Sequence, residues 1–293
     1  MSLLELIATR VAVLDGAMGT ELQARGLPPG ESGDWWSVSQ PDHIRAIHAA
    51  YRDAGCDILT TNSFGANIWV LDRLGHTDQV EAVNRAAAEL AVSVAGPGMT
   101  VLGDIGPSGQ LVEPLGPVTI TQLHDEFARQ ARALLDGGAA GIIVETMSSL
   151  EEAVAAVEAS RTAGADLVVA MMAFSRLPNG RQRTMMGVAP EQAARALCDA
   201  GATIVGANCG AHMGFDAFAA AVALMRGAVD VPVAALPNAG QPRWEDGRAV
   251  YDLGPAPFAD GMRAVINAGA AVVGGCCGTT PAHVAALRRV VGS

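Results

Sequence analysis

Two adjacent cysteines in a glycine-rich turn are the residues of this chain best suited to chemistry. Cys276 and Cys277 follow the apolar run 271–275, and Cys209 follows another apolar run, 203–208. Three protein ligands with a fourth position left open are typical of catalytic zinc, whereas structural zinc is normally closed by four. The sequence therefore predicts a zinc site formed by Cys209, Cys276 and Cys277, with the open position available to a substrate.

Two other interpretations of the cysteine pair remain. Cys276 and Cys277 could be small buried side chains, or they could form a vicinal disulfide. The neighbouring glycines, the helix start at residues 279–281 and the third cysteine at a matching strand end favour the metal site. Cys56 opens a predicted strand and Cys198 lies inside a predicted helix, so we expect both of these in the core.

A site of three thiolates favours thiol chemistry over the activation of water. With one Zn²⁺, three thiolates give a net charge of about −1, so the ion is a weaker Lewis acid than one bound by three histidines. Such a site can bind an incoming thiol, lower its pKa from about 8.5 and keep the thiolate nucleophilic. We therefore expect alkylation of a thiol.

Short apolar runs alternate with longer alanine-rich segments along the whole chain. The runs predict eight strands, at residues 11–15, 57–62, 100–104, 141–145, 167–173, 203–208, 231–236 and 271–275. The other segments predict helices at residues 41–54, 79–95, 121–136, 149–163, 190–200, 215–228, 257–268 and 281–290. Strands that are apolar on both faces and joined by helices pair in parallel. We predict an α/β fold, a single (β/α)8 TIM-type barrel, with residues 1–293 as one domain. A doubly wound open sheet is the alternative.

A barrel of this kind builds its active site at the carboxyl ends of its strands. The polar residues at the predicted strand ends are Asp15, Asn62, Asp104, Glu145, Asn208, Cys209, Asn238, Cys276 and Cys277. The sixth and eighth strands are two apart on a closed ring, so the loops that carry the three cysteines can reach one ion.

Composition excludes several classes of protein. The 293 residues carry a net charge of −11 and no basic run, which argues against nucleic acid and an anionic membrane as partners. Every basic residue apart from histidine is an arginine, so Schiff-base lysine chemistry and the phosphate-binding lysine of P-loops are excluded. No apolar run approaches the roughly 20 residues that span a bilayer, and the start of the chain does not resemble a secretory signal. We expect a cytoplasmic protein.

Seven short motifs are spread over the chain, at residues 14–20, 60–66, 103–107, 144–146, 208–209, 237–240 and 274–281. The last of them, GGCCGTTP, is the most specific, whereas the Asp-Gly and Glu-Thr pieces would be weak alone. Together they strongly resemble the zinc-dependent homocysteine S-methyltransferase family, and most of all the homocysteine-binding domain of cobalamin-dependent methionine synthase. The resemblance implies a barrel enzyme that transfers a methyl group to the thiolate of homocysteine and forms methionine.

The resemblance also implies a role for each candidate metal ligand. Cys209, Cys276 and Cys277 would be the catalytic residues and would bind Zn²⁺, with the homocysteine thiolate in the fourth position. Asn238 resembles the family's candidate oxygen ligand, which holds zinc until the substrate displaces it. The alternative for Asn238 is an ordinary turn residue.

Substrate-binding residues follow from the same resemblance. It implies that Asp15 and Glu145 lie near the substrate ammonium, and that the backbone amides of Gly16 and Ala17 receive the substrate carboxylate. Two carboxylates suit a cation, and exposed N–H groups suit an anion. The alternatives are a turn cap for Asp15 and an ordinary ion pair at the barrel mouth for Glu145.

The methyl donor differs among members of the family. The motifs at residues 62–66, 104–107 and 237–240 are most similar to those of the cobalamin enzyme, and no fused corrinoid domain follows them. We therefore expect a stand-alone homocysteine module that takes the methyl group of methylcobalamin on a separate corrinoid protein. The alternatives are a non-autonomous subunit of a split methionine synthase, or a thiol methyltransferase that uses betaine or a sulfonium donor.

Overall fold

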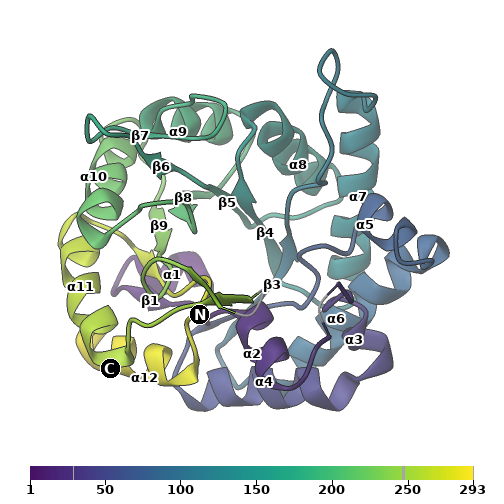
Figure 1. Cartoon of the computed structure of the whole chain (residues 1–293), viewed down its shortest axis with the longest axis horizontal. Coiled ribbons are helices and arrows are strands. Elements are labelled where there is room, and N and C mark those ends of the chain that lie inside the picture. The colour runs from purple at the N-terminus through teal and green to yellow at the C-terminus, as the bar shows by residue number, and fades with distance from the viewer. Residues whose placement is uncertain (29, 246–247, 293) are drawn as a thin grey trace.

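Eight parallel strands close into a barrel at the centre of the molecule, which is a computed structural model that describes residues 1–28, 30–245 and 248–292 (Figure 1). The strands pair in the order β1, β12, β9, β8, β5, β4, β3, β2. Their bounds are β1 (Ala12–Val13), β2 (Ile58–Thr60), β3 (Thr100–Ile105), β4 (Gly141–Met147), β5 (Val168–Met172), β8 (Ile204–Asn208), β9 (Val233–Leu236) and β12 (Val272–Val273). A parallel bridge between Leu14 and Ile58 joins the two ends of the sheet. The predicted barrel is thus confirmed, and the open-sheet alternative is wrong.

Among the described residues, eight longer helices surround the strands, one after each strand (Figure 1). They are α4 (Pro41–Asp53), α6 (Val80–Val94), α7 (Ile120–Asp136), α8 (Leu150–Thr162), α9 (Pro190–Asp199), α10 (Phe215–Arg226), α11 (Pro255–Asn267) and α12 (Pro281–Val291). Local signals explain where several of them begin. The side chains of Thr119 and Ser149 accept hydrogen bonds from the first turns of α7 and α8, and proline occupies the first position of α4, α9 and α12.

Several short elements were not predicted. They are the helices α1 (Leu3–Ile7), α2 (Met18–Ala24), α3 (Trp36–Ser39) and α5 (Ile68–Asp72), the 3₁₀ turn η1 (Thr77–Gln79), and two hairpins, β6 (Ser175–Arg176) with β7 (Gln182–Arg183) and β10 (Arg243–Glu245) with β11 (Arg248–Val250). Segments of two to seven residues are too short to show a hydrophobic period, so their sequences could not be told from loops.

Two hydrophobic cores hold the barrel together. One lies between the strands and the outer helices and contains most of the buried apolar residues. The other fills the inside of the barrel with one or two side chains from each strand, among them Leu102 and Ile143. Leu3 and Leu6 of α1 belong to this inner core, so the first helix packs against the apolar interior.

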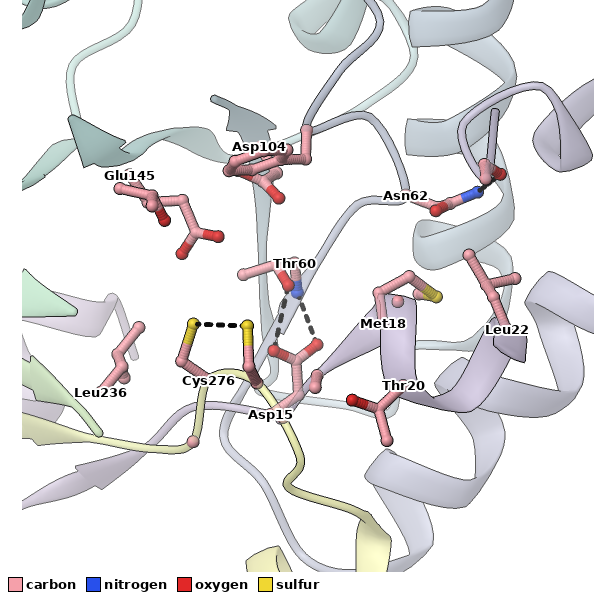
Figure 2. Close-up of a pocket in the computed structure, with 18 of the residues that line it drawn as sticks. Asp15, Met18, Thr20, Leu22, Thr60, Asn62, Asp104, Glu145, Leu236 and Cys276 are labelled. Carbon is pink, nitrogen blue, oxygen red and sulfur yellow. Dashed lines mark hydrogen bonds between the residues drawn. The ribbon is translucent and has the colours of Figure 1, made fainter. Parts of the chain in front are cut away.

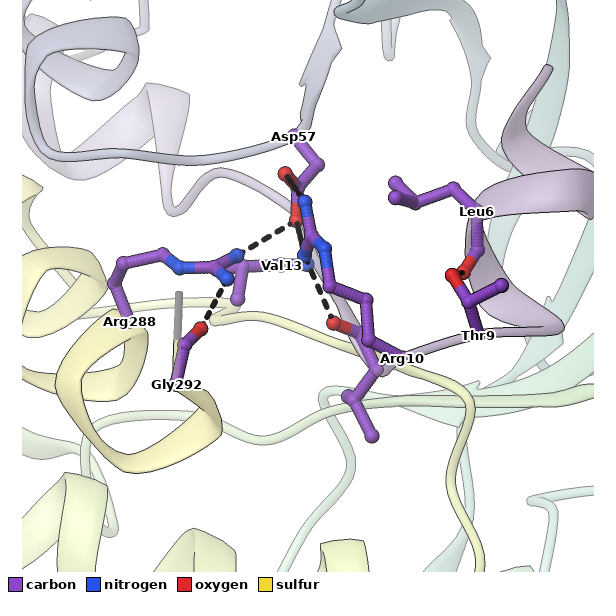
Figure 3. A network of polar contacts seen from close by, with 8 residues as sticks. Leu6, Thr9, Arg10, Val13, Asp57, Arg288 and Gly292 are labelled. Atoms are coloured by element: carbon purple, nitrogen blue, oxygen red, sulfur yellow. Dashed lines mark hydrogen bonds and ion pairs between the residues drawn. The ribbon is translucent and has the colours of Figure 1, made fainter. Parts of the chain in front are cut away.

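A cluster of charges fastens the amino-terminal ends of β1 and β2 to the last helix (Figure 3). Asp57, just before β2, receives two hydrogen bonds from Arg10, at 2.6 and 2.9 Å, and one from Arg288 of α12, at 2.9 Å. The Val13 amide donates to the same carboxylate at 2.9 Å. Burial acts to raise the pKa of Asp57, but the hydrogen bonds from Arg10 and Val13 and the charge of Arg288 lower it overall. This cluster therefore connects α12 to β1 and β2, the two strands whose pairing closes the barrel.

None of the helices in the described ranges has the length and apolar character needed to cross a membrane.

Candidate active site

The three predicted ligand cysteines come together at the carboxyl ends of β8 and β12. Their sulfur atoms all lie within 4.8 Å of one another, and the Sγ atoms of Cys276 and Cys277 are 4.0 Å apart. Zinc–sulfur bonds of about 2.3 Å in a tetrahedron place two sulfurs about 3.8 Å apart. The spacing of the cysteines therefore fits a single zinc ion. The cysteines are free thiols, so the disulfide interpretation is wrong for this structure.

Backbone geometry around the cysteines is unusual. Cys209 has φ 54, in the left-handed region that non-glycine residues rarely occupy, and such strain is found mainly at functional sites. Gly278 has φ 80, and a Cβ atom there would lie 2.3 Å from the Tyr251 side chain. A Cβ atom on Gly275 would lie 2.4 Å from Thr279 Oγ1. Glycines on both sides of the cysteine pair are thus required for the loop to pack.

The three thiols share protons unequally. Hydrogen bonds from Cys276 and Cys277 hold the pKa of Cys209 well below its usual range, and the Asn238 side chain lowers it further. The same hydrogen bonds to Cys209 raise the pKa of Cys276, and they raise the pKa of Cys277 to about 11. The arrangement of the three sulfurs therefore favours negative charge on Cys209, which would attract a cation.

Asn238 follows β9 and lies beside Cys209. Its side-chain oxygen Oδ1 is buried and has no hydrogen-bond partner among the described residues. The Asn238 side chain contacts Cys209. A buried amide oxygen usually has a partner, so an unpaired one on this side chain is compatible with a further metal ligand. Asn238 is not among the described residues that line the cavity below.

A cavity of about 330 Å³ opens above the cysteines at the barrel mouth (Figure 2). Of the predicted site residues, Asp15, Gly16, Ala17, Glu145, Cys209, Cys276 and Cys277 line it. Among the described lining residues none is an arginine, lysine or histidine, whereas Asp34 and Asp104 add two further carboxyl groups. The cavity is therefore acidic and suits a ligand with a positive charge.

Asp15 is almost completely buried at the end of β1. The backbone amide of Thr60 donates to its carboxylate at 2.8 Å, and the Thr60 hydroxyl donates at 3.0 Å (Figure 2). Burial raises the pKa of Asp15 to about 8, against the effect of these hydrogen bonds and with a further increase from the charge of Glu145.

Glu145 stands at the end of β4, on the side of the cavity opposite Asp15 in Figure 2. Burial and then the negative charge of Cys209 raise its pKa to about 7. The next residue, Thr146, has φ 60 and is held by Asn208, which accepts from its amide at 2.8 Å and donates to its hydroxyl at 2.7 Å. Since Cys209 follows Asn208, these two bonds fix the end of β4 against the loop that carries Cys209.

The turn at Gly16 and Ala17 is fastened to the cysteine loop. Thr279 Oγ1 accepts a hydrogen bond from the Ala17 amide at 3.1 Å and donates to the Cys276 carbonyl at 2.7 Å. The Tyr51 hydroxyl donates to the Ala17 carbonyl at 3.1 Å. A Cβ atom on Gly16 would lie 2.8 Å from Thr279 Oγ1 and 2.9 Å from the Tyr51 ring, so only glycine fits there. One of the two predicted amide donors, that of Ala17, thus already has a partner.

Sequence motifs did not reveal the residues that hold this arrangement in place. Thr60, Thr146 and Thr279 all belong to the motifs described above, yet nothing in the sequence showed which neighbours they would bind. The position of Asp104 at a strand end was visible, but no pattern gave it a role. In each case the partner is more than 40 positions away, which is why only the folded chain reveals the contact.

A closed (β/α)8 barrel with three thiols beside an acidic cavity defines a barrel enzyme with a sulfur-rich centre. The homocysteine S-methyltransferase family model matches residues 12–291, and the chain belongs to this family. The methionine synthases of Mycobacterium tuberculosis and Mycobacterium leprae are each 32% identical to it over 99% of its length. The chain spans 25% of the length of these curated relatives.

Solved structures agree with this assignment. The metallated form of the homocysteine methyltransferase MmuM from Escherichia coli is similar to this chain with a TM-score of 0.79 and 25% identity, covering 98% of this chain and 99% of that one. The apo form of the same protein has a TM-score of 0.73 and 26% identity, covering 96% of each chain. The recognised family and the fold are therefore confirmed.

Proposed function

We propose that the chain is a zinc-dependent S-methyltransferase that transfers a methyl group to the thiolate of homocysteine and forms methionine. The observation that carries the proposal is the cluster of three sulfurs within 4.8 Å of one another, on the wall of a cavity that is also lined by Asp15 and Glu145. Membership of the homocysteine S-methyltransferase family supports the same activity. We take residues 1–293 to be one domain that contains the whole site.

Cys209, Cys276 and Cys277 would hold the metal ion, and the orphaned Asn238 oxygen would complete its ligands before a substrate enters. Thiolate ligands at this spacing suit zinc. A zinc ion there would supply the positive charge that lowers the pKa of an added thiol while leaving its sulfur nucleophilic.

The remaining site residues would orient the amino-acid part of the substrate. The carboxylates of Asp15 and Glu145 attract the ammonium group, and desolvation inside the cavity strengthens this attraction. Since the Ala17 amide already donates to Thr279, we assign the substrate carboxylate to the Gly16 amide. In this orientation the thiol of homocysteine points toward the three cysteines.

Methyl transfer needs few groups beyond these. The electron pair of the substrate sulfur forms the new bond to the methyl carbon, and the pair of the bond that breaks leaves with the donor. The thiol proton passes to solvent when the substrate enters the site, before this step, so no side chain has to accept a proton during it. The cavity would therefore contribute by excluding water and by aligning the substrate sulfur, the methyl carbon and the donor atom from which the methyl group departs.

For the donor we propose methylcobalamin carried by a separate corrinoid protein. The higher identity to methionine synthases, 32% against 25% for MmuM, favours this choice. A second candidate is a betaine or sulfonium donor, which the acidic cavity favours because such donors are cations. Under the first candidate the chain would act as the homocysteine-binding subunit of a larger assembly.

Zinc content and methionine formation, measured on the same protein, test the proposal. Purified protein is given homocysteine with methylcobalamin, betaine, S-methylmethionine or S-adenosylmethionine in parallel, with and without zinc removal by a chelator. We expect about one zinc per chain, methionine with one donor, and loss of activity that added zinc restores. Zinc without product from any free donor, but with product from a methylated corrinoid protein, would identify the subunit. Full activity in metal-free protein would contradict the proposal.

A further inference from the structure

Asp104 is a buried carboxyl group in the wall of the cavity, and its side chain has no role in the site as described. It lies in β3 and is only 7% exposed, yet it lines the cavity. Its backbone is held on both sides, since its amide donates to Thr61 Oγ1 at 2.8 Å and its carbonyl accepts from Ser63 Oγ at 2.7 Å. Its side-chain Oδ1 is buried without a hydrogen-bond partner among the described residues. In Figure 2, Asp104 lies at the upper edge of the site, on the same side as Glu145 and above Thr60.

Asp104 and Asp15 differ in the hydrogen-bond donors that the protein supplies to their carboxyl groups. Thr60 satisfies Asp15 with two donors, at 2.8 and 3.0 Å. Asp104 Oδ1 receives no such donor from the described chain. A buried carboxylate without donors is unfavourable, so such a group is expected to have its partner in a bound ligand. The capacity to accept new hydrogen bonds therefore lies with Asp104 more than with Asp15.

The surroundings of Asp104 show which ligand would fit. Burial and then the charges of Glu145, Asp34 and Asp15 all raise its pKa well above the usual range. A group that carries positive charge and several N–H donors would reverse this effect, because it favours the ionised carboxyl group. No lining residue in the described ranges can supply one, since none is an arginine, lysine or histidine.

We propose that Asp104 binds the ammonium group of the amino-acid thiol and thereby selects a substrate with a positive charge near its sulfur. The inference rests on the proposed function, because it takes the bound thiol to be homocysteine. Asp104 would accept from the ammonium group as a third carboxyl group beside Glu145 and Asp15, of which Asp15 already accepts two hydrogen bonds from Thr60. The cationic methyl donor is the other source of such a charge, so the test must separate the two.

The binding of two thiols, measured without any methyl donor, separates these two sources of positive charge. One is L-homocysteine, and the other is 4-sulfanylbutanoate, which has the same thiol and carboxylate but no ammonium group. Affinities are measured by calorimetry on the zinc-loaded full chain, for the native protein, Asp104→Asn and Asp104→Glu. The matched control is Asp166→Asn, which removes a fully exposed carboxylate. Zinc content and the unfolding temperature of each variant are measured alongside.

In the native protein and in Asp166→Asn, homocysteine should bind more tightly than 4-sulfanylbutanoate. In Asp104→Asn this preference should fall by about tenfold or more, the range expected for a charge-assisted hydrogen bond, with 4-sulfanylbutanoate affinity and zinc content unchanged. Asp104→Glu should keep most of the preference because it keeps the charge. Asn has nearly the same shape as the carboxyl group, and Asp104 Oδ1 has no hydrogen-bond partner among the described residues to lose, so the unfolding temperature should not fall.

An unchanged preference in Asp104→Asn would overturn the assignment, and so would an equal loss of affinity for both thiols. If a variant binds both thiols normally and a separate activity assay shows a raised KM for a cationic methyl donor, Asp104 belongs to the donor subsite instead, which also overturns the proposal. If the native protein binds neither thiol, the proposed function fails together with this inference. If it binds homocysteine normally and only the Asp104 result is negative, the proposed function stands.

Discussion

Replacement of Thr279 by valine should lower the free energy of unfolding. It should also loosen the turn at Gly16 and Ala17, to which we assign the substrate carboxylate. Thr279 is completely buried, and its hydroxyl joins the Ala17 amide at 3.1 Å to the Cys276 carbonyl at 2.7 Å. Valine has the same shape and makes neither hydrogen bond. It therefore leaves the part-buried Ala17 amide unpaired, at about 1–3 kcal/mol, whereas the Cys276 carbonyl keeps a hydrogen bond from the Thr279 amide at 3.1 Å. We expect the free energy of unfolding to fall by about 1–3 kcal/mol, against a usual total of about 5–15 kcal/mol.

Serine provides the matched comparison at this position. Thr279→Ser keeps the hydroxyl and removes one methyl group, which should cost about 1 kcal/mol. Thr162→Val, at an exposed site near the end of α8, controls for the loss of any threonine hydroxyl and should change little. Urea unfolding measures all three variants, provided that each is two-state.

Enzyme kinetics of the same variants separate positioning from stability. Because Thr279 connects the turn at Gly16 and Ala17 to the cysteine loop, the KM for homocysteine should rise in Thr279→Val while zinc content stays near that of the native protein. Thr279→Ser should restore the native KM. The reasoning is refuted if valine destabilises no more than serine does, or if valine changes only the stability and leaves KM unaltered.

Three further predictions concern the three cysteines, the hydrophobic core and the charge cluster at the amino-terminal ends of β1 and β2. Cys277→Ser should lower zinc content and abolish methyl transfer while the barrel stays folded; a folded variant with full zinc and normal rate would show that Cys277 is not a ligand. His48 is fully buried with no partner for either ring nitrogen among the described residues, and burial lowers its pKa to about 4. The unfolded chain therefore binds the extra proton between pH 6.5 and 4, so stability should fall by up to about 3 kcal/mol as the pH is lowered through that window, and His48→Leu should remove this part of the slope in a pH series of urea unfolding curves. Asp57→Asn should lower the free energy of unfolding by about 1–3 kcal/mol because it removes the charge that Arg10 and Arg288 share, with KM unchanged since the cluster lies at the opposite end of the barrel; a change in KM without loss of stability would contradict this.

Much of the fold could be predicted because the barrel repeats one local pattern eight times. Each central strand is a short run that is apolar on both faces, and each helix carries local start and stop signals, such as Thr119 before α7 and Pro281 at the start of α12. The predicted bounds agree with the structure to within a few residues. The hairpin of β10 and β11 and the short helix α2 were missed because neither is long enough to show a period.

The candidate site was predictable as a set of residues but not as a geometry. The motif around Cys276 and Cys277 and its partner Cys209 indicated three sulfurs at neighbouring strand ends, and the fold brings them within 4.8 Å. The roles implied for Asp15, Glu145 and Asn238 stay predictions. The structure adds their surroundings, such as the two donors of Thr60 on Asp15.

The sequence by itself determined the eight repeating units, the chemistry of three thiols and the family, because these depend on residue types and local spacing. Only the tertiary structure decided which polar side chains have hydrogen-bond partners within the protein and which have none among the described residues. Ala17 and Thr279 are separated by 262 positions and meet through one hydroxyl, whereas Asp104 enters the same cavity with no donor for its Oδ1 among the described residues. Hydrogen bonding and desolvation depend on distances across the closed barrel, and those distances exist only after the chain has folded.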